Sequence, residues 1–422
     1  MDIDSLLQPF QRFGVHLGLE RIERLLADLG NPHHWVSVIH VAGTNGKGSV
    51  CAYLSAVLTE AGYRVGRYTS PHLVDWHERI CLNEQPITTE VLQELLIQIK
   101  SAIPEKSEDS PTQFEVITAA AWLYFAQQKV DIAVIEVGLG GRLDATNVCR
   151  PLVTIITSLS REHWQVLGPT LADIAREKAG IFKSGCPTVI GQLPPEAKAV
   201  VEQQIKELGC PAVWVKPAQQ IKDGWAEYEG IKYPLPLLGE IQLSNSAIAI
   251  ATLQILQQQN WQITETTIIS GMAKTKWLGR LQWTTWQNHR LLIDGAHNPA
   301  AAIALRQYVD TLHLPVTWVM GILSTKDHAD IFAALLRPAD KLYLVPVPDH
   351  SSADPEALAI LAQNICPELA DCHTYSDLGT GLEVAISNTS KTSESLIVLC
   401  GSLYLVGYFL KQNSSSINSK LS

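Results

Sequence analysis

The sequence has no long apolar run and no closely paired cysteines. None of its apolar stretches reaches the roughly 20 residues that a membrane-spanning helix requires, and its first residues, MDIDSLLQPFQRFG, do not resemble a signal peptide. The eight cysteines are scattered without any C-x-x-C pair, which indicates neither a zinc site nor a disulfide framework. We therefore expect a cytoplasmic protein with reduced, mostly buried thiols.

An excess of positive charge is also missing. The chain has 32 basic and 42 acidic residues, a net charge of −10, which argues against nucleic acid or an anionic membrane as the main partner. An anionic small substrate must then be held by local features. At 422 residues the chain is longer than one hydrophobic core usually spans, so we expect two domains.

Apolar, strand-like runs alternate with helical patterns along most of the chain. This alternation predicts an α/β fold whose parallel sheets carry helices on both faces. The runs cover residues 132–137, 152–157, 188–190, 291–293, 316–320, 342–347 and 396–399. We place the domain boundary near residues 277–288, which mix Gly, Trp and polar residues without a period, and we interpret residues 101–112 as a flexible loop.

A glycine-rich loop with one lysine follows the apolar run in VSVIHVAGTNGKGS, residues 36–49. Val36 to Val41 predict a buried strand, and Ser49 opens a helix whose apolar periodicity ends at Gly62. Such a loop directs backbone N–H groups and the positive end of a helix at an anion. Lys47 adds a charge for the β- and γ-phosphates of ATP, and Ser49 a hydroxyl for Mg²⁺.

The spacing departs from the Walker pattern, because position 41 is Val and Gly48 separates Lys47 from Ser49. The alternative is an ordinary glycine-rich turn, but the strand, the helix and the lysine together favour nucleotide binding. The loop resembles that of the Mur ligase superfamily, and its Gly-Ser ending is similar to the folylpolyglutamate synthase and dihydrofolate synthase branch. The resemblance implies that the nucleotide is bound by Gly43, Thr44, Asn45, Gly46, Lys47, Gly48 and Ser49.

The resemblance runs from about residue 13 to residue 408. It implies a P-loop-type ATPase domain with a mostly parallel sheet (1–280), a linker (281–289) and a smaller Rossmann-like C-terminal glutamate ligase domain (290–411). We expect residues 412–422 to be a disordered tail. The implied activity is ATP-dependent addition of L-glutamate to dihydropteroate, reduced folate or both through an acyl phosphate. We expect a bifunctional, monomeric enzyme.

One carboxylate, Glu136, ends a predicted strand beside the glycines of GLGGRLDATN. Ligands bind at the carboxyl ends of strands in open α/β sheets, and carboxylate oxygens suit magnesium. From the residues alone, a helix-capping role is equally good, but resemblance to the family motif favours a metal ligand. Ser70 and His163 match the other metal-associated positions of the family, although Glu162 stands where Asp is usual.

Lys178 lies in a helical pattern, where a lysine usually forms a surface ion pair. The matching lysine of the superfamily is carbamylated and, as an anion, helps to hold magnesium. An amine whose pKa is lowered by burial can take up carbon dioxide. The resemblance therefore implies both catalytic and metal-binding roles for Lys178, and a catalytic role for Lys47.

Further positions of the resemblance lie toward the C-terminus. Asn245 matches an adenine-side asparagine, although Ile241 stands where His is common, and Arg280 matches a residue that reaches phosphates across the domain junction. Asp294 and His297 resemble the nucleotide-facing motif of the second domain, with His297 catalytic. Each is weak alone, because such residues commonly cap helices or form surface pairs.

Three stretches resemble those that line the pterin site of the family. From the residues alone, the alternative interpretation of Phe114 is a core aromatic, and that of residues 17–22 is a plain amphipathic helix. The implied acceptor-binding residues are Leu17, Gly18, Leu19, Thr112, Gln113, Phe114, Glu115, Leu143, Asp144 and Ala145.

Two rival functions stay open. A Mur ligase of peptidoglycan synthesis has a sizeable UDP-sugar-binding domain before the loop, and the position of Lys47 leaves no room for it. A nucleotide-dependent switch or binding module would hold or hydrolyse ATP without ligase chemistry.

Overall fold

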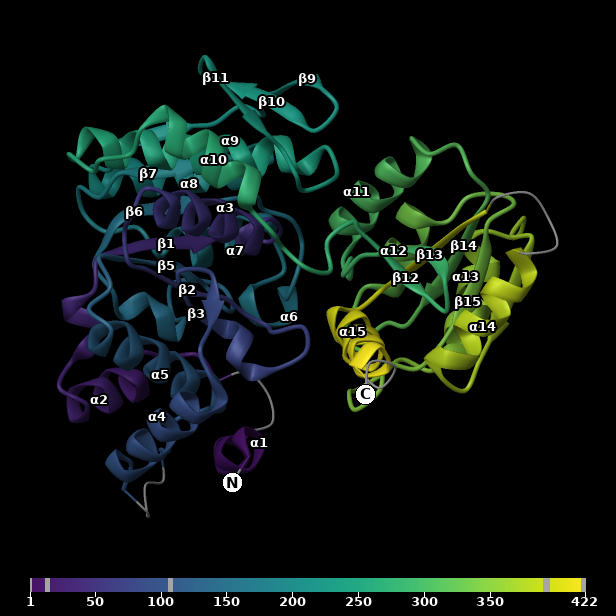
Figure 1. Ribbon diagram of the computed structural model, residues 1–422, viewed down its shortest axis with the longest axis horizontal. Coiled ribbons are helices and arrows are strands. Elements are labelled where there is room, and N and C mark those ends of the chain that lie inside the picture. The colour runs from purple at the N-terminus through teal and green to yellow at the C-terminus, as the bar shows by residue number, and fades with distance from the viewer. Residues whose placement is uncertain (1, 12–15, 105–108, 390–394, 419–422) are drawn as a thin grey trace. The chain divides into compact units, whose positions relative to one another are not determined.

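The chain folds into two units in the computed structural model, which describes residues 2–11, 16–104, 109–389 and 395–418. The first unit contains Met1–Pro236 and Ile241–Lys276, and the second contains Leu237–Glu240 and Trp277–Ser422 (Figure 1). The predicted boundary region starts at residue 277, where the main segment of the second unit begins. The predicted linker 281–289 is wrong, because these residues form β12 (Gln282–Trp286) and the start of β13 (His289–Ile293).

The first unit is built on an eight-stranded sheet in the order β4-β3-β2-β5-β1-β6-β7-β8. Its strands β2, β5, β1, β6, β7 and β8 are parallel, and β3 and β4 are antiparallel additions at one edge. Every residue of β1 and β5 is buried, which explains why both strands are mostly apolar. The bounds are β1 Val38–Ala42, β2 Val65–Tyr68, β3 Ile80–Leu82, β4 Gln85–Pro86, β5 Ile132–Glu136, β6 Pro151–Ile156, β7 Thr188–Ile190 and β8 Ala212–Trp214.

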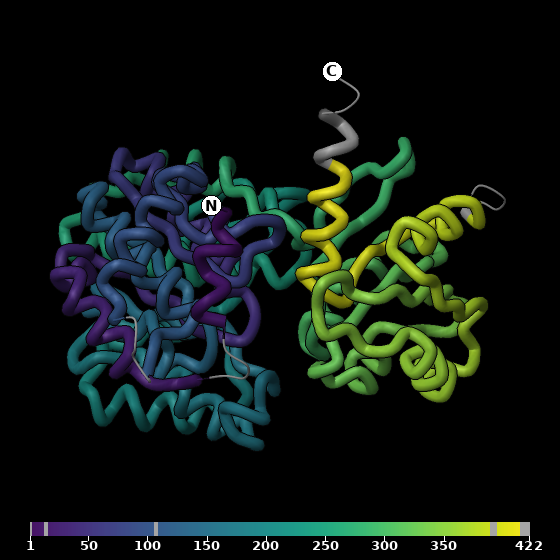
Figure 2. The backbone as a smooth tube through the Cα atoms, turned by 90° about the horizontal axis from the view of Figure 1, so that it is seen from below, coloured from purple at the N-terminus to yellow at the C-terminus, as the bar shows by residue number. Residues whose placement is uncertain are grey.

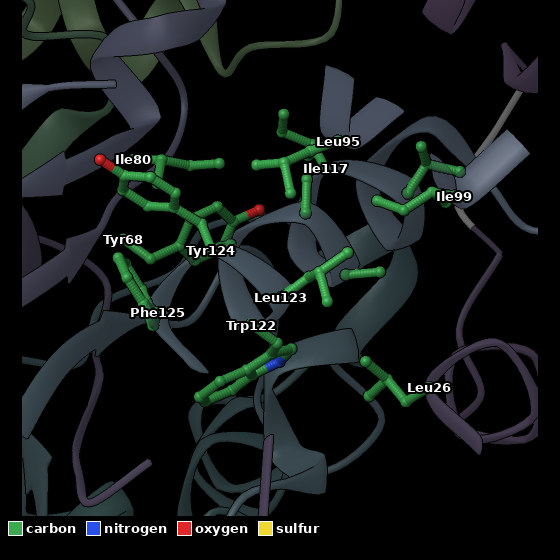
Figure 3. Close-up of a cluster of buried hydrophobic side chains, with 14 of the residues drawn as sticks. Leu26, Tyr68, Ile80, Leu95, Ile99, Ile117, Trp122, Leu123, Tyr124 and Phe125 are labelled. Atoms are coloured by element: carbon green, nitrogen blue, oxygen red, sulfur yellow. The ribbon is translucent and has the colours of Figure 1, made fainter. Parts of the chain in front are cut away.

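Helices cover both faces of this sheet (Figure 1). The helix α5 packs on α2 and α4 around a cluster that includes Trp122, Phe125 and Tyr68 (Figure 3). A small antiparallel sheet precedes α9 in the chain: β9 Gln219–Lys222, β10 Trp225–Tyr228 and β11 Ile231–Pro234. The helices are α1 Ile3–Leu7, α2 Glu20–Asp28, α3 Lys47–Glu60, α4 Thr89–Ala102, α5 Gln113–Gln127, α6 Trp164–Leu167, α7 Leu171–Ala179, α8 Pro195–Leu208, α9 Ile241–Gln258 and α10 Glu265–Lys274.

The second unit is a six-stranded sheet in the order β12-β13-β17-β14-β15-β16. Only β12 is antiparallel to its neighbour among these strands, so the predicted parallel α/β pattern is confirmed. The remaining strands are β14 Val316–Met320, β15 Lys341–Leu344, β16 Asp371–Thr374 and β17 Leu396–Cys400. The helices are α11 Pro299–Asp310, α12 His328–Leu335, α13 Pro355–Ile365, α14 Leu378–Thr389 and α15 Leu403–Asn418.

The helix α15 has the bounds Leu403–Asn418, and its first part is the yellow helix in Figure 2. The predicted disordered tail, residues 412–422, overlaps the end of this helix, and its residues 419–422 lie outside the described residues. Helix propagation from a packed first half costs little, and the buried Val406 and Phe409 anchor that half. Asn413 adds a tertiary contact, because its side-chain amide donates to the Thr285 carbonyl at 3.0 Å.

Other sequence predictions have mixed outcomes. All eight cysteines are free and seven are buried, as expected.

The predicted loop 101–112 is shorter than expected, since α4 reaches Ala102 and Thr112 caps α5, and its residues 105–108 lie outside the described residues. In the described part of the chain, every helix is too short or too polar to traverse a bilayer.

Candidate functional site

The glycine-rich loop joins β1 to α3, and its conformation requires glycine at two positions. Gly43 has φ +149° and Gly46 has φ +87°. A Cβ at Gly43 would overlap the Thr157 hydroxyl, and one at Gly46 would overlap the Asn245 amide oxygen. The helix begins at Lys47, two residues before the predicted start. Its first N–H groups have no acceptor within the helix, so the loop has the form of an anion cradle.

The end of β6 holds this loop in place. The Thr44 and Asn45 N–H groups donate to the Ser158 carbonyl at 2.8 Å and the Ser158 hydroxyl at 3.1 Å. In return, the hydroxyls of Thr157 and Ser158 donate to the Asn45 carbonyl at 2.6 and 3.0 Å. These bonds fix the loop before any ligand binds, which reduces the conformational entropy that binding costs.

Two lysine side chains meet at the first residue of the loop. The Lys47 ammonium donates to the Gly43 carbonyl at 3.0 Å and to the Thr44 carbonyl at 3.1 Å. The Lys178 Nζ donates to the same Gly43 carbonyl at 2.9 Å. Lys178 is 6% exposed, so its alternative interpretation as a surface lysine is wrong.

The environment of Lys178 weakens its hold on a proton. Burial, reinforced by the positive charge of Lys47, lowers the pKa of Lys178 to about 7, while Glu162 and Asp144 act in the opposite direction. The unperturbed value is 10.5. A large share of this side chain is therefore a neutral amine near neutral pH, which is the nucleophilic form.

Glu136 and Ser70 lie side by side at the carboxyl ends of neighbouring strands. Glu136 ends β5 and is 5% exposed, and the Ser70 N–H donates to its Oε2 at 3.0 Å. Glu136 is also aligned with Val41 of β1, just before the loop. A buried carboxylate beside a serine and the phosphate loop is a donor set suited to magnesium.

His163 is less closely bound to this group. It follows β6, has φ 50° and precedes α6, and its side chain is 48% exposed, with Nε2 3.9 Å from the Glu162 carboxylate. Within the described residues, no three His, Cys, Asp or Glu side chains are grouped as a metal site. The carboxylate of Glu162, which departs from the family pattern, raises the pKa of Lys178 and so acts on that amine.

Asn245 contacts the loop from α9, together with a residue that the sequence analysis missed. The Asn245 side-chain amide donates to the Gln242 oxygen at 3.1 Å, and the Gln242 amide donates to the Ser49 hydroxyl at 3.4 Å. Both side chains are buried. The i, i+3 spacing places Gln242 on the same face of α9 as Asn245, but it does not indicate the contact with Ser49.

The three predicted acceptor stretches lie together. The Gly18 N–H donates to the Leu143 carbonyl at 3.3 Å, and Arg21 binds Glu115 with 3.1 Å between Nε and each carboxylate oxygen. A Cβ on Gly138, two residues after Glu136, would overlap the Phe114 ring. The stretches therefore converge beside the carboxyl end of β5.

Two of the predicted acceptor residues already have internal partners. Glu115 forms a capping box with Thr112 at the start of α5. Asp144 is buried and accepts from the Leu139 N–H at 2.8 Å and the Thr146 hydroxyl at 2.6 Å. Burial raises the pKa of Asp144. Through these hydrogen bonds, Glu115 and Asp144 stabilise the loops and helices that would line a binding site.

The second unit brings Arg280, Asp294 and His297 together at the carboxyl end of β13. Asp294 is buried and accepts from the Leu281 and Ala296 N–H groups at 2.8 and 2.7 Å; burial raises its pKa, and the charge of Arg280 opposes that rise. The His297 Nδ1 lies 2.7 Å from the Gly295 carbonyl. Because a carbonyl only accepts, Nδ1 carries a proton.

A first unit with a phosphate loop and a second, Rossmann-like unit define a nucleotide-dependent ligase of the Mur type. Residues 41–253 match the family model of the Mur ligase middle domain, and residues 279–412 match that of the dihydrofolate synthetase C-terminal domain. The chain belongs to the folylpolyglutamate synthase/dihydrofolate synthase family.

Individual relatives support this assignment. The dihydrofolate synthetase of Saccharomyces cerevisiae is 36% identical over 433 residues, with 96% of this chain and 100% of the relative covered. The dihydrofolate synthase/folylpolyglutamate synthase of Bacillus subtilis is 33% identical, with 97% and 98% covered. The bifunctional enzyme of Yersinia pestis, complexed with AMPPNP and a Mn ion, has a TM-score of 0.83 and 30% identity, with 97% and 96% covered.

We predict that Gly46→Ala weakens MgATP binding by about tenfold or more, since a small displacement of a positioned group has effects of that size. The added Cβ would displace Asn245 and strain a backbone with φ +87°. Gly62→Ala is the matched control, because Gly62 has φ +91° but open space around it. It should lower stability by about 1–2 kcal/mol and leave MgATP binding unchanged. Titration calorimetry and thermal melting compare the two, and equal MgATP affinity would contradict the proposed loop geometry.

Proposed function

We propose that this chain is an ATP-dependent ligase that adds L-glutamate to dihydropteroate, to reduced folate or to both. The observation that carries the proposal is the meeting of Lys47 and the buried Lys178 at the Gly43 carbonyl, beside Glu136. A nucleotide switch needs one lysine at its phosphate loop. A second, buried amine with a lowered pKa is what a ligase of this superfamily would use at its metal site.

The proposed reaction activates a carboxylate, which is otherwise a poor electrophile. The pteroate or folate carboxylate takes the γ-phosphoryl group of ATP, the glutamate amine attacks the resulting acyl phosphate, and ADP and phosphate leave. Lys47 neutralises charge on the transferring group, and the N–H groups that begin α3 hold the phosphates. The loop residues 43–49 and Asn245 make up the nucleotide site.

We propose that Ser49, Ser70, Glu136, His163 and a carbamylated Lys178 hold magnesium. When bound, the ion neutralises phosphate charge. Lys178 reaches this state when its neutral Nζ attacks carbon dioxide, forming a C–N bond and releasing one proton. The carbamate would face Glu162 and Asp144, which are like charges, so a cation is needed to stabilise the cluster.

In the second unit, Arg280, Asp294 and His297 form the proposed nucleotide-facing motif. Both oxygens of Asp294 accept backbone N–H groups, which supports a role for Asp294 in shaping the segment that carries His297. For the acceptor, we propose the stretches 17–19, 112–115 and 143–145. A monomer in the cytoplasm stays a prediction, as does the choice between the two acceptors.

We predict that ADP is released only when ATP, glutamate and a pterin acceptor are all present. Lys47→Ala should lower this turnover at least about a hundredfold, because it removes a charge from the phosphate loop, while the melting temperature changes little. Lys183→Ala is the control, since Lys183 also donates to a backbone carbonyl, that of Asn147 at 3.1 Å. A coupled ADP-release assay with each acceptor in turn measures this, and glutamate-independent hydrolysis would indicate a switch instead.

We predict that Glu136→Gln and His163→Ala each raise the magnesium concentration needed for half-maximal turnover, because each removes a proposed ligand. Glu60→Gln is a control on the same unit, where the carboxylate binds Lys274 and Ser270 instead. Magnesium titrations of turnover give the comparison. If both variants titrate like the unsubstituted protein, the metal lies elsewhere.

We predict that Lys178→Ala is nearly inactive and that short-chain carboxylates partly restore its turnover. Carbamate formation needs the neutral amine, and a pKa of about 7 means that the amine is available above pH 7 and protonated below it. Activity at low carbon dioxide should therefore fall as the pH drops through 7. Mass spectrometry and rate measurements in carbon dioxide-depleted buffer test this; a fully active enzyme with a bare amine would refute the carbamate.

A further inference from the structure

A buried arginine of β2 lies beneath the helix that carries the phosphate loop. Arg67 is 7% exposed. Its neighbours face the opposite side of the sheet: a Cβ on Gly66 would lie 2.8 Å from the Phe125 ring, and the Tyr68 hydroxyl is 2.9 Å from that of Thr118. Both partners belong to α5. Since side chains alternate along a strand, Arg67 is directed to the other face, where α3 packs.

The Arg67 guanidinium joins three segments of the first unit. Its Nη2 is 3.3 Å from the Sγ of Cys81, which is directly opposite in the β2–β3 register. The same Nη2 is 3.7 Å from Oε2 of Glu84, in the turn after β3. The Ser55 hydroxyl of α3 donates to the other oxygen of Glu84. The ion pair therefore ties α3 to β2 and to the β3–β4 turn.

This network reaches the phosphate loop along one face of α3. Lys47, Cys51 and Ser55 follow one another at i, i+4 spacing, which places them on the same side of the helix. Burial raises the pKa of the Cys51 thiol; the charge of Glu136 raises it further, whereas the charges of Arg67 and Lys47 lower it. The Arg67 guanidinium and the Lys47 ammonium therefore both lie close enough to Cys51 to interact electrostatically with its thiol.

The same network reaches the proposed magnesium residues along β2. Arg67 precedes Ser70 by three residues, and the Ser70 N–H donates to Glu136 at 3.0 Å. The position of β2 against α3 therefore sets the spacing between Ser70 and Glu136 on one side and Lys47 and Ser49 on the other.

Stability gives little reason to keep a cation at this position. Burying a guanidinium carries a desolvation penalty, and well-packed apolar replacements of buried ion pairs are often neutral or stabilising. The partner carboxylate, moreover, lies in a turn where Glu84 has φ +64°, a conformation uncommon for residues other than glycine. A specific positioning effect explains both features.

We propose that Arg67, held by Glu84, is a positioning residue for the phosphate loop. It fixes α3 against β2, so that Lys47 and Ser49 keep their spacing from Ser70 and Glu136. This inference rests on the proposed function, because it assigns Arg67 to the nucleotide and metal site of that ligase.

The test is Arg67→Met in the full chain, which keeps the length of the side chain and removes its charge. We expect kcat/KM for MgATP to fall about ten- to a hundredfold, as for other displaced catalytic groups, while KM for glutamate stays within about twofold. Arg67→Lys keeps the charge facing Glu84 and should recover part of the loss. Ser55→Ala, which leaves the ion pair intact, should cause a smaller change in the same direction.

Arg306→Met is the matched control. The side chains of Arg67 and Arg306 are each 9% exposed, and Arg306 pairs with Asp340 at 2.7 Å, but it lies in the second unit. It should lower the melting temperature at least as much as Arg67→Met and leave kcat/KM for MgATP unchanged.

Three outcomes would overturn the proposal. The first is a normal kcat/KM for MgATP in Arg67→Met. The second is a loss of kcat/KM for MgATP in Arg306→Met equal to the loss in Arg67→Met at the same temperature. The third, if Arg67→Met does not fold, is an unchanged kcat/KM for MgATP in Ser55→Ala. Lys47→Ala separates this failure from that of the proposed function. If Lys47→Ala impairs MgATP use and Arg67→Met does not, only the role of Arg67 is refuted; if neither does, the phosphate site itself is wrongly assigned.

Discussion

One backbone carbonyl, that of Gly43, accepts hydrogen bonds from two lysines, and the candidate site depends on this meeting point. Lys47 and Lys178 approach it at 3.0 and 2.9 Å. The approach requires a residue without a side chain, because a Cβ at Gly43 would overlap Thr157. Two amines at one oxygen repel each other when both are charged, and in the interior this repulsion is strong. Burial and Lys47 therefore lower the pKa of Lys178, which makes its amine chemically available.

The fold was predictable where burial leaves a recognisable pattern of apolar residues in the sequence. The strands β7 and β14 have the predicted bounds, because parallel strands covered on both faces consist of continuous apolar residues. The hairpin of β12 and β13 was missed, since its turn has positive φ at both Gln287 and Asn288, and of these two residue types only Asn favours that conformation. The small sheet β9-β10-β11 was missed as well: β9 is fully exposed and shows no apolar period.

The site was predictable where its residues belong to one short motif, as in the loop from Gly43 to Ser49. It was not predictable where partners come from distant parts of the chain: Gln242 and Ser49 are 193 residues apart, and Ser55 and Glu84 are 29 apart. No local pattern reports such pairs. The family resemblance also does not distinguish direct binding from support, and Asp144 and Glu115 accept bonds from their own surroundings.

Charge balance explains why a chain with a net charge of −10 can present a positive site. Three basic side chains near the loop are positioned by oxygen atoms: Lys47 and Lys178 by the Gly43 carbonyl, and Arg67 by the Glu84 carboxylate. Carbamylation of Lys178, as proposed, would reverse the local interactions. The repulsion between Lys47 and the Lys178 side chain would become attraction, and the attraction of Glu162 and Asp144 for that side chain would become repulsion. The neutral amine can take up either a proton or carbon dioxide, so a cation bound beside Glu136 would favour the carbamylated state over the protonated one.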